Sequence, residues 1–148
     1  MPIEWPDGPE ESTMTVEIPD NWPTPPAGSP IILVASEPFK VNIGWTVPTP
    51  YDTTLGGSFR LRAYVESIGP GPEIQIGPTL TVPVAPGQTN YTATIDVPAG
   101  TLVGEGATVD GAPVSGVYRI TAVIQHLNPN PTSVSGFVED TVRMFRTP

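Results

Sequence analysis

The chain has 148 residues, a length that fits one domain with a hydrophobic core of its own. It contains no cysteine, which excludes disulfides and thiolate metal sites, and its net charge of −9 disfavours binding to nucleic acid and to anionic membranes. The charge is uneven, because residues 1–30 hold six acidic residues and no basic one, whereas residues 31–148 hold nine acidic and six basic ones.

Residues 1–30 also carry eight prolines, which cannot continue a helix or donate a full set of sheet hydrogen bonds. They predict an extended acidic arm ahead of a domain over residues 31–148. Within the arm, Met14, Val16 and Ile18 alternate with polar residues, and this alternation predicts one edge strand. Packing of the arm against its own sheet and packing against a neighbour both remain open.

From residue 31 onward the apolar residues recur at every second position. The runs 38–47, 58–68, 79–84, 91–97 and 118–125 each place one set of side chains towards a core and the other towards water. The residues expected in the core include Phe39, Val41, Ile43, Trp45, Phe59, Leu61, Ala63, Val65, Tyr91, Ile95, Tyr118, Ile120 and Ile124. Glycine- and proline-rich connectors separate these runs, so we expect an all-β fold with almost no helix beyond a short turn near residues 99–102.

The last run, 137–146, is rich in strand-forming residues but has no clear alternation. We expect a bulge or kink near Glu139 and Asp140, which would explain the change of parity.

The segment 114–123 places Tyr118 two residues after Gly116, at the start of an alternating run. In this it resembles the sixth strand of immunoglobulin-like and fibronectin-III-like domains. The resemblance covers residues 31–146 and implies a single antiparallel β-sandwich of about seven strands, in which the Tyr118 hydroxyl bonds to the backbone of the preceding loop. It is to the broad superfamily, since both cysteines of the antibody pattern are missing and Trp45 lies on the second expected strand.

The residue pattern offers little chemistry for catalysis. His126 is the only histidine, and we expect it at a strand end or loop edge. No nucleophile-elbow motif occurs, and the adjacent acids Glu10 with Glu11 and Glu139 with Asp140 would point to opposite faces of a strand. The loop carboxylates lack the dense spacing of a calcium loop. We therefore expect no enzyme activity, no metal and no cofactor.

Trp5, Trp22 and Tyr51 lie in proline-rich, non-strand context, where aromatic side chains are favoured contact anchors. We therefore expect a non-catalytic structural or adaptor protein that binds a protein partner or forms a homo-oligomer. In architecture it is similar to accessory subunits of phage-like particles and contractile injection systems. The alternative is a carbohydrate- or surface-polymer-binding module, with Tyr51 stacking on sugar rings.

The first residues, 1–7, lack the basic and apolar regions of a signal peptide, and the longest apolar run, 31–35, is too short to span a bilayer. The sequence thus predicts a location in the cytoplasm or within a larger particle, without membrane insertion.

Overall fold

The structure, a computed structural model, describes residue 3, residues 12–19, residue 21 and residues 32–145, with the side chains of residues 143–145 left aside. Its strands are β1 (Met14–Glu17), β2 (Ile32–Val34), β3 (Phe39–Thr46), β4 (Ser58–Ser67), β5 (Glu73–Pro83), β6 (Asn90–Val97), β7 (Thr108–Val109), β8 (Ala112–Pro113), β9 (Val117–Leu127) and β10 (Pro131–Phe145). In this part of the chain the one helix is α1 (Tyr51–Thr54).

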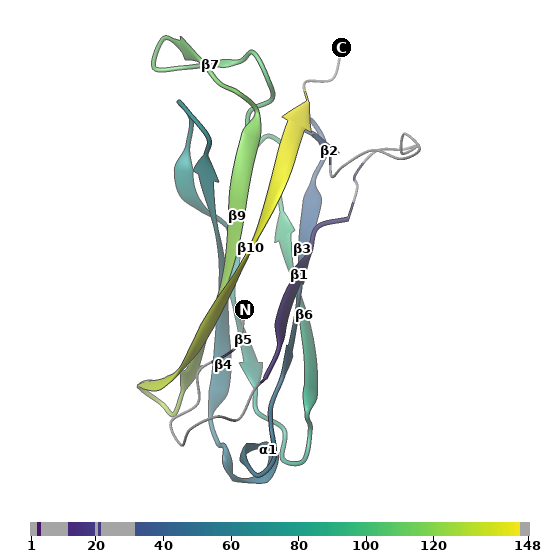
Figure 1. The fold of residues 1–148 in the computed structure, drawn as a ribbon, viewed down its shortest axis with the longest axis vertical. Coiled ribbons are helices and arrows are strands. Elements are labelled where there is room, and N and C mark those ends of the chain that lie inside the picture. Colours follow the sequence, from purple (N-terminus) through teal and green to yellow (C-terminus); the bar gives the residue numbers. More distant parts are fainter. Residues whose placement is uncertain (1–2, 4–11, 20, 22–31, 146–148) are drawn as a thin grey trace.

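The strands form two main sheets that pack face to face, so the expected all-β sandwich is confirmed. One sheet has the order β2–β10–β9–β4–β5 and the other the order β1–β3–β6, while β7 and β8 form a separate hairpin. In Figure 1 the two sheets run along the long axis, with β4 and β9 on the left, β1, β3 and β6 on the right, and β10 crossing from the lower left to the upper right. Helix α1 lies at the lower end and the β7–β8 hairpin at the upper end.

The expected alternation decides which side chains fill the space between the sheets. On β3 and β4 every second residue is buried, and the same holds for β9 from Tyr118 to His126. The residues of these strands that were assigned to the core are exposed by 4% or less. Because the alternate side chains of a strand point to opposite faces, the remaining residues of the two sheets form two outer faces.

An aromatic cluster joins the sheets near α1. Trp45 of β3 stacks on Tyr91 of β6 with ring centroids 5.4 Å apart, and both meet Phe59 of β4 edge to face. Phe59 also packs edge to face against the ring of His126 on β9. The cluster therefore connects the three-stranded sheet to the centre of the five-stranded one.

Tyr118 makes the contact that the resemblance implied. Its hydroxyl donates a hydrogen bond to the backbone carbonyl of Val103, in the segment before β7, with an oxygen–oxygen distance of 2.7 Å. Burial raises the pKa of this hydroxyl above its usual value. The bond fastens the chain between β6 and β9 to the core.

Three features differ from the sequence-based expectations. Beyond the arm the two main sheets hold seven strands, as expected, but β2 pairs with β10 in parallel. The prediction of a bulge or kink near Glu139 and Asp140 is wrong, because β10 keeps one register against β9 from Ser135 to Arg143. The irregularity of this pairing lies between Pro131 and Ser135. The short turn expected near residues 99–102 is present, and the unexpected feature is the four-residue helix α1.

The edge strand expected in the first 30 residues is present as β1, which pairs antiparallel with β3. Met14 and Ile18 are buried in the shared core, and Val16 packs against it. Residues 1–2, 4–11, 20 and 22–31 lie outside the described residues, and these include Trp5 and Trp22, so the extended conformation of the arm stays a prediction.

Candidate functional site

Of the three aromatic residues expected to contact a partner, the described part of the chain includes Tyr51. This residue begins α1, is half-buried and packs against the hydrophobic core. Its ring is therefore partly committed to the fold, and its role in binding a partner stays a prediction.

His126 lies one residue before the end of β9, close to where the sequence placed it, and is 2% exposed. Its Nε2 contacts the backbone carbonyl of Gly56, and its Nδ1 lies 2.9 Å from the hydroxyl oxygen of Thr132. Since a carbonyl oxygen only accepts hydrogen bonds, Nε2 carries a proton and donates it. The ring thus ties the α1–β4 connection and the start of β10 to β9.

The described residues contain no group of three or more histidine, cysteine, aspartate or glutamate side chains placed to hold a metal ion. Nor does any helix in this part of the chain have the length and apolar character needed to cross a membrane.

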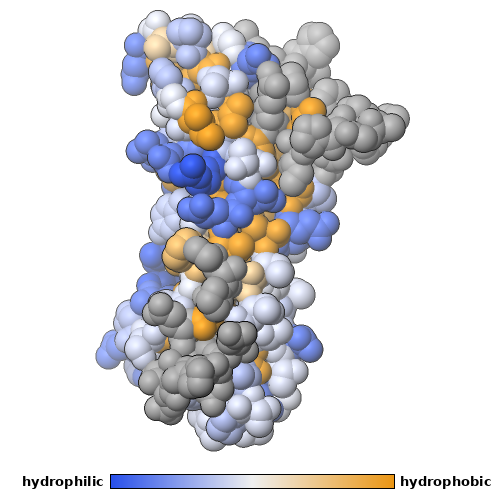
Figure 2. Space-filling model, viewed as in Figure 1, coloured by the Kyte–Doolittle hydropathy of each residue, from blue (hydrophilic) through white to orange (hydrophobic). Residues whose placement is uncertain are grey.

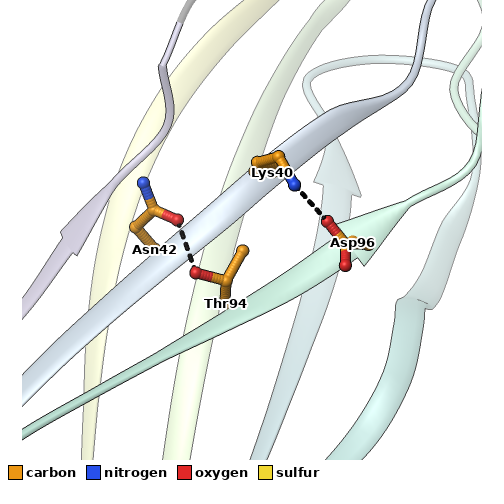
Figure 3. A network of polar contacts seen from close by, with 4 residues as sticks. All are labelled: Lys40, Asn42, Thr94 and Asp96. Atoms are coloured by element: carbon orange, nitrogen blue, oxygen red, sulfur yellow. Dashed lines mark hydrogen bonds and ion pairs between the residues drawn. The ribbon is translucent and has the colours of Figure 1, made fainter.

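The outer face of the three-stranded sheet is polar, and its side chains pair across strands. The Lys40 ammonium on β3 lies 2.7 Å from the carboxylate of Asp96 on β6, and the Thr94 hydroxyl donates to the amide oxygen of Asn42 at 2.9 Å (Figure 3). At the centre, Gly44 has no side chain and leaves a shallow hollow of about 370 Å³. The hollow is lined by Thr15, Glu17, Asn42, Ile43, Gly44, Thr92, Ala93 and Thr94.

The outer face of the five-stranded sheet has a different composition. Strand β4 directs Arg60, Arg62, Tyr64 and Glu66 outward, between the buried residues Phe59 to Val65. Register places Val123 of β9 beside Arg62, and Phe137 of β10 beside Val123. We call the surface formed by Arg60, Arg62, Tyr64, Val123 and Phe137 the arginine–aromatic face.

Aromatic side chains on this face reach solvent. Phe137 is 44% exposed and Tyr64 37% exposed, although both belong to regular strands. Ile68 and Ile74 are similarly exposed, although Ile74 pairs with the core-facing Val65 and so belongs to the opposite side of the sheet. A second hollow of about 370 Å³ runs along β4 and β5 at Tyr64, Glu66 and Ile74. In the view of Figure 2, hydrophobic residues reach the surface in several small groups between hydrophilic ones.

The two arginines of the face lack counter-ions within the described structure. Arg60 donates a hydrogen bond to the side-chain oxygen of Gln125, and Arg62 has a buried Nε without a hydrogen-bond partner. Between described residues, ion pairs join Lys40 with Asp96 and Arg119 with Glu66. A buried donor left without a partner costs about 1–3 kcal/mol, and the described residues supply no acceptor to the Nε of Arg62.

The sequence alone predicted part of the arginine–aromatic face. The alternation over 58–68 already put Arg60, Arg62 and Tyr64 on the face opposite the core. The sequence could not place Phe137 on the same face, because the run 137–146 shows no clear alternation of buried and exposed positions. The pairing of β10 with β9, which brings Phe137 there, is a feature of the tertiary structure.

No protein-family model and no curated protein matches the chain. Among solved structures it is similar to part of a beta-glucosidase from Listeria innocua, at 10% identity and a TM-score of 0.49, covering 92% of this chain and 16% of that one. A beta-glucosidase involved in saponin metabolism from intestinal bacteria matches at 15% identity and a TM-score of 0.46, over 88% of this chain and 16% of that one. The chain thus spans about a sixth of these proteins. At these values the likeness assigns neither an activity nor a substrate to it.

Proposed function

We propose that this chain is a non-catalytic structural or adaptor protein that binds a protein surface through the arginine–aromatic face. The observation that carries the proposal is Arg62, half-buried between exposed aromatic residues and with no partner for its Nε in the described structure. Aromatic residues and arginine are enriched at the centres of protein–protein interfaces, where they contribute most of the binding free energy.

The neighbours of Arg62 add to this proposal. Phe137 and Tyr64 expose large rings on a rigid sheet, so their side chains lose little conformational entropy when a partner covers them. Glutamate, which is depleted at interface cores, borders the face at Glu66 and Glu139. Glu66 lies two residues beyond Tyr64 on β4, and Glu139 lies beyond Phe137 on β10.

The test is site-specific photo-crosslinking from the two outer faces. A photoreactive phenylalanine analogue replaces Tyr64 in one variant and Thr94, on the three-stranded sheet, in the other. Since the proposal assigns binding to one face, we expect protein adducts from position 64 and few from position 94. Denaturing electrophoresis and mass spectrometry of the products provide the measurement.

Equal adducts from the two positions would contradict the choice of face, and a lack of adducts from position 64 would remove the proposal. The Thr94 variant serves as a matched control, because Thr94 is also an exposed outward residue of a central part of a strand. The broader placement in a phage-like or contractile assembly remains a proposal from architecture alone.

A carbohydrate- or surface-polymer-binding module is the second candidate, favoured by the hollow over Gly44. Its lining offers the hydroxyls of Thr15, Thr92 and Thr94, the amide of Asn42 and the carboxylate of Glu17. This lining suits a polyhydroxylated ligand but includes no aromatic ring for stacking. A glycan array would decide: binding by the wild type that Gly44→Val abolishes would support this candidate, and an array without binding would remove it.

We also propose kinship with the broad immunoglobulin-like and fibronectin-III-like superfamily. The bond from Tyr118 to Val103 and the packing of a three-stranded sheet on a five-stranded one support it. Such a fold hosts many unrelated activities, so this kinship adds nothing to the choice of partner.

A further inference from the structure

Charge changes sign along the outer face of the five-stranded sheet. The outward residues of β4 run from Arg60 and Arg62 through Tyr64 to Glu66. The acidic half is continued by Glu73, which lies opposite Glu66 on β5, and by Glu139 of β10, while Arg119 of β9, paired with Glu66, is its basic member among the described side chains. The basic half has no acid within register of Arg60 or Arg62, since their neighbours on β9 are Gln125 and Val123.

The charges of such a face are complementary to those of an identical face whose strands run in the opposite direction. We propose that two copies of this chain pair face to face through the five-stranded sheet, about a two-fold axis that lies in the interface, runs across the strands and passes at Ala63. This inference rests on the proposed function and names the partner. The axis reverses β4, so Arg60 meets Glu66 of the second copy and Arg62 meets Tyr64 of the second copy.

Each of these contacts occurs twice, because a two-fold interface is isologous. The Arg60–Glu66 contact joins an arginine without a counter-ion to a carboxylate whose own ion pair with Arg119 is loose, at 3.6 Å, and exposed. The Arg62–Tyr64 contact places a guanidinium on an aromatic ring, a favourable cation–π geometry. At the periphery the same axis sets Val117 of β9 against Leu127 of the second copy.

The geometry suits this mode of packing. Two sheets that pack face to face lie about 10 Å apart, with their strand directions roughly aligned, and the end-to-end reversal keeps the strands antiparallel and aligned. Four strands at about 4.8 Å spacing and some ten residues of β4 cover on the order of 500 Å² of flat area per copy. This is below the roughly 800 Å² per partner of a standard interface. We therefore expect a dissociation constant of the dimer in the micromolar range. Because each copy carries a net charge of −9, the dimer is best measured at physiological salt, where repulsion between distant charges is screened.

The experiment is a charge exchange across the axis, followed by sedimentation velocity of the full chain over a wide range of concentrations. Arg60→Glu and Glu66→Arg each put like charges together at both symmetric contacts, so we expect each single variant to weaken dimerisation by about tenfold or more. The double variant Arg60→Glu with Glu66→Arg restores opposite charges at both contacts. Its dimerisation should return to within about threefold of the wild type. Lys40→Glu, on the other sheet, is the matched control and should leave the dimer unchanged.

A wild type that stays monomeric at every concentration would overturn the inference, and so would a double variant as weak as either single one. Thermal unfolding of each variant shows that the fold is intact, and a mixture of the two single variants provides a second readout. In the mixed dimer both symmetric contacts regain opposite charges, so it should be tighter than the dimer of either variant alone. The proposed function fails separately: adducts from position 64 to a different protein, together with a monomeric wild type, would keep the function and remove the self-association.

Discussion

The outer faces of the two sheets differ in how their polar side chains are satisfied. On the three-stranded sheet Lys40 has Asp96 and Asn42 has Thr94, each across one pair of strands. On the five-stranded sheet Arg62 has a buried Nε without a partner, although it lies at the centre of the face rather than at a rim. Both faces are carried by the same core and the same kind of strand.

The contrast separates a face that is complete within one chain from a face that is not. Cross-strand pairs such as Lys40 with Asp96 contribute a few tenths of a kcal/mol each to a sheet and need nothing from outside. An unpaired arginine between exposed rings contributes nothing of this kind to the monomer. The arginine–aromatic face has the composition of a protein–protein interface, and for this reason we propose that the five-stranded sheet binds the partner.

Both outer faces rest on one shared hydrophobic core, and the substitution Trp45→Ala should destabilise that core. Trp45 is 2% exposed and stacks against Tyr91 and Phe59 where the sheets meet. We expect a loss of about 3–5 kcal/mol in the free energy of unfolding, because the substitution removes a large buried ring and leaves a cavity. Urea denaturation followed by circular dichroism measures this loss.

Phe137→Ala is the matched control, since it removes an aromatic ring of an outer face that is 44% exposed. Its cost should stay below about 0.5 kcal/mol at concentrations where the chain is monomeric. Equal losses for the two variants would mean that Phe137 belongs to the core, and the contrast between the faces would have to be abandoned.

Tyr118 provides a second, smaller way to probe the core. Tyr118→Phe leaves the Val103 carbonyl without its donor, and we expect a loss of about 1 kcal/mol at neutral pH. Burial raises the pKa of the hydroxyl in the folded state, so the proton is held more tightly there than in the unfolded chain. The contribution of Tyr118 is therefore complete below the unfolded pKa of about 10 and is lost as the pH rises through the folded pKa.

The measurement is the free energy of unfolding of both proteins between neutral pH and the alkaline range. The wild type should lose stability more steeply above about pH 10 than Tyr118→Phe, and the two curves should converge. Parallel curves would show that the hydroxyl ionises as easily in the folded state as in the unfolded one.

The alternation in the sequence was sufficient for the fold class and for most of the core. It assigned Phe59, Leu61 and Tyr118 correctly because burial of one face of a strand leaves a period of two that survives in any sheet order. It could not supply the parallel pairing of β2 with β10 or the bulge of β5 opposite Arg62, because both depend on which strands become neighbours.

The candidate site was predictable only in part for the same reason. Arg60, Arg62 and Tyr64 are close in sequence, and their common side follows from one strand. Phe137 joins them through two register relations, β4 with β9 and β9 with β10. The lack of a partner for Arg62 is likewise visible only once every neighbour is in place.

The smallest expected effect gives the most direct test of the contrast. Lys40→Met and Arg62→Met both replace a long cation with an apolar side chain of similar length, one on each outer face. Lys40→Met removes an exposed ion pair and should cost about 0.2–0.5 kcal/mol, less at high salt. Arg62→Met removes a buried donor that has no partner, so we expect no loss and a gain of up to about 0.5 kcal/mol.

Chemical denaturation at low protein concentration measures both variants in the monomer, where a docked partner cannot contribute. If Arg62→Met proved more destabilising than Lys40→Met, the arginine would be serving the sheet itself, by covering apolar side chains with its stem. Arg62 would then have a structural role within the chain, and the strongest reason to assign binding to the five-stranded sheet would be gone. If Arg62→Met left the monomer as stable as the wild type or more stable, and also weakened dimerisation, Arg62 would contribute to binding and not to the stability of its own chain.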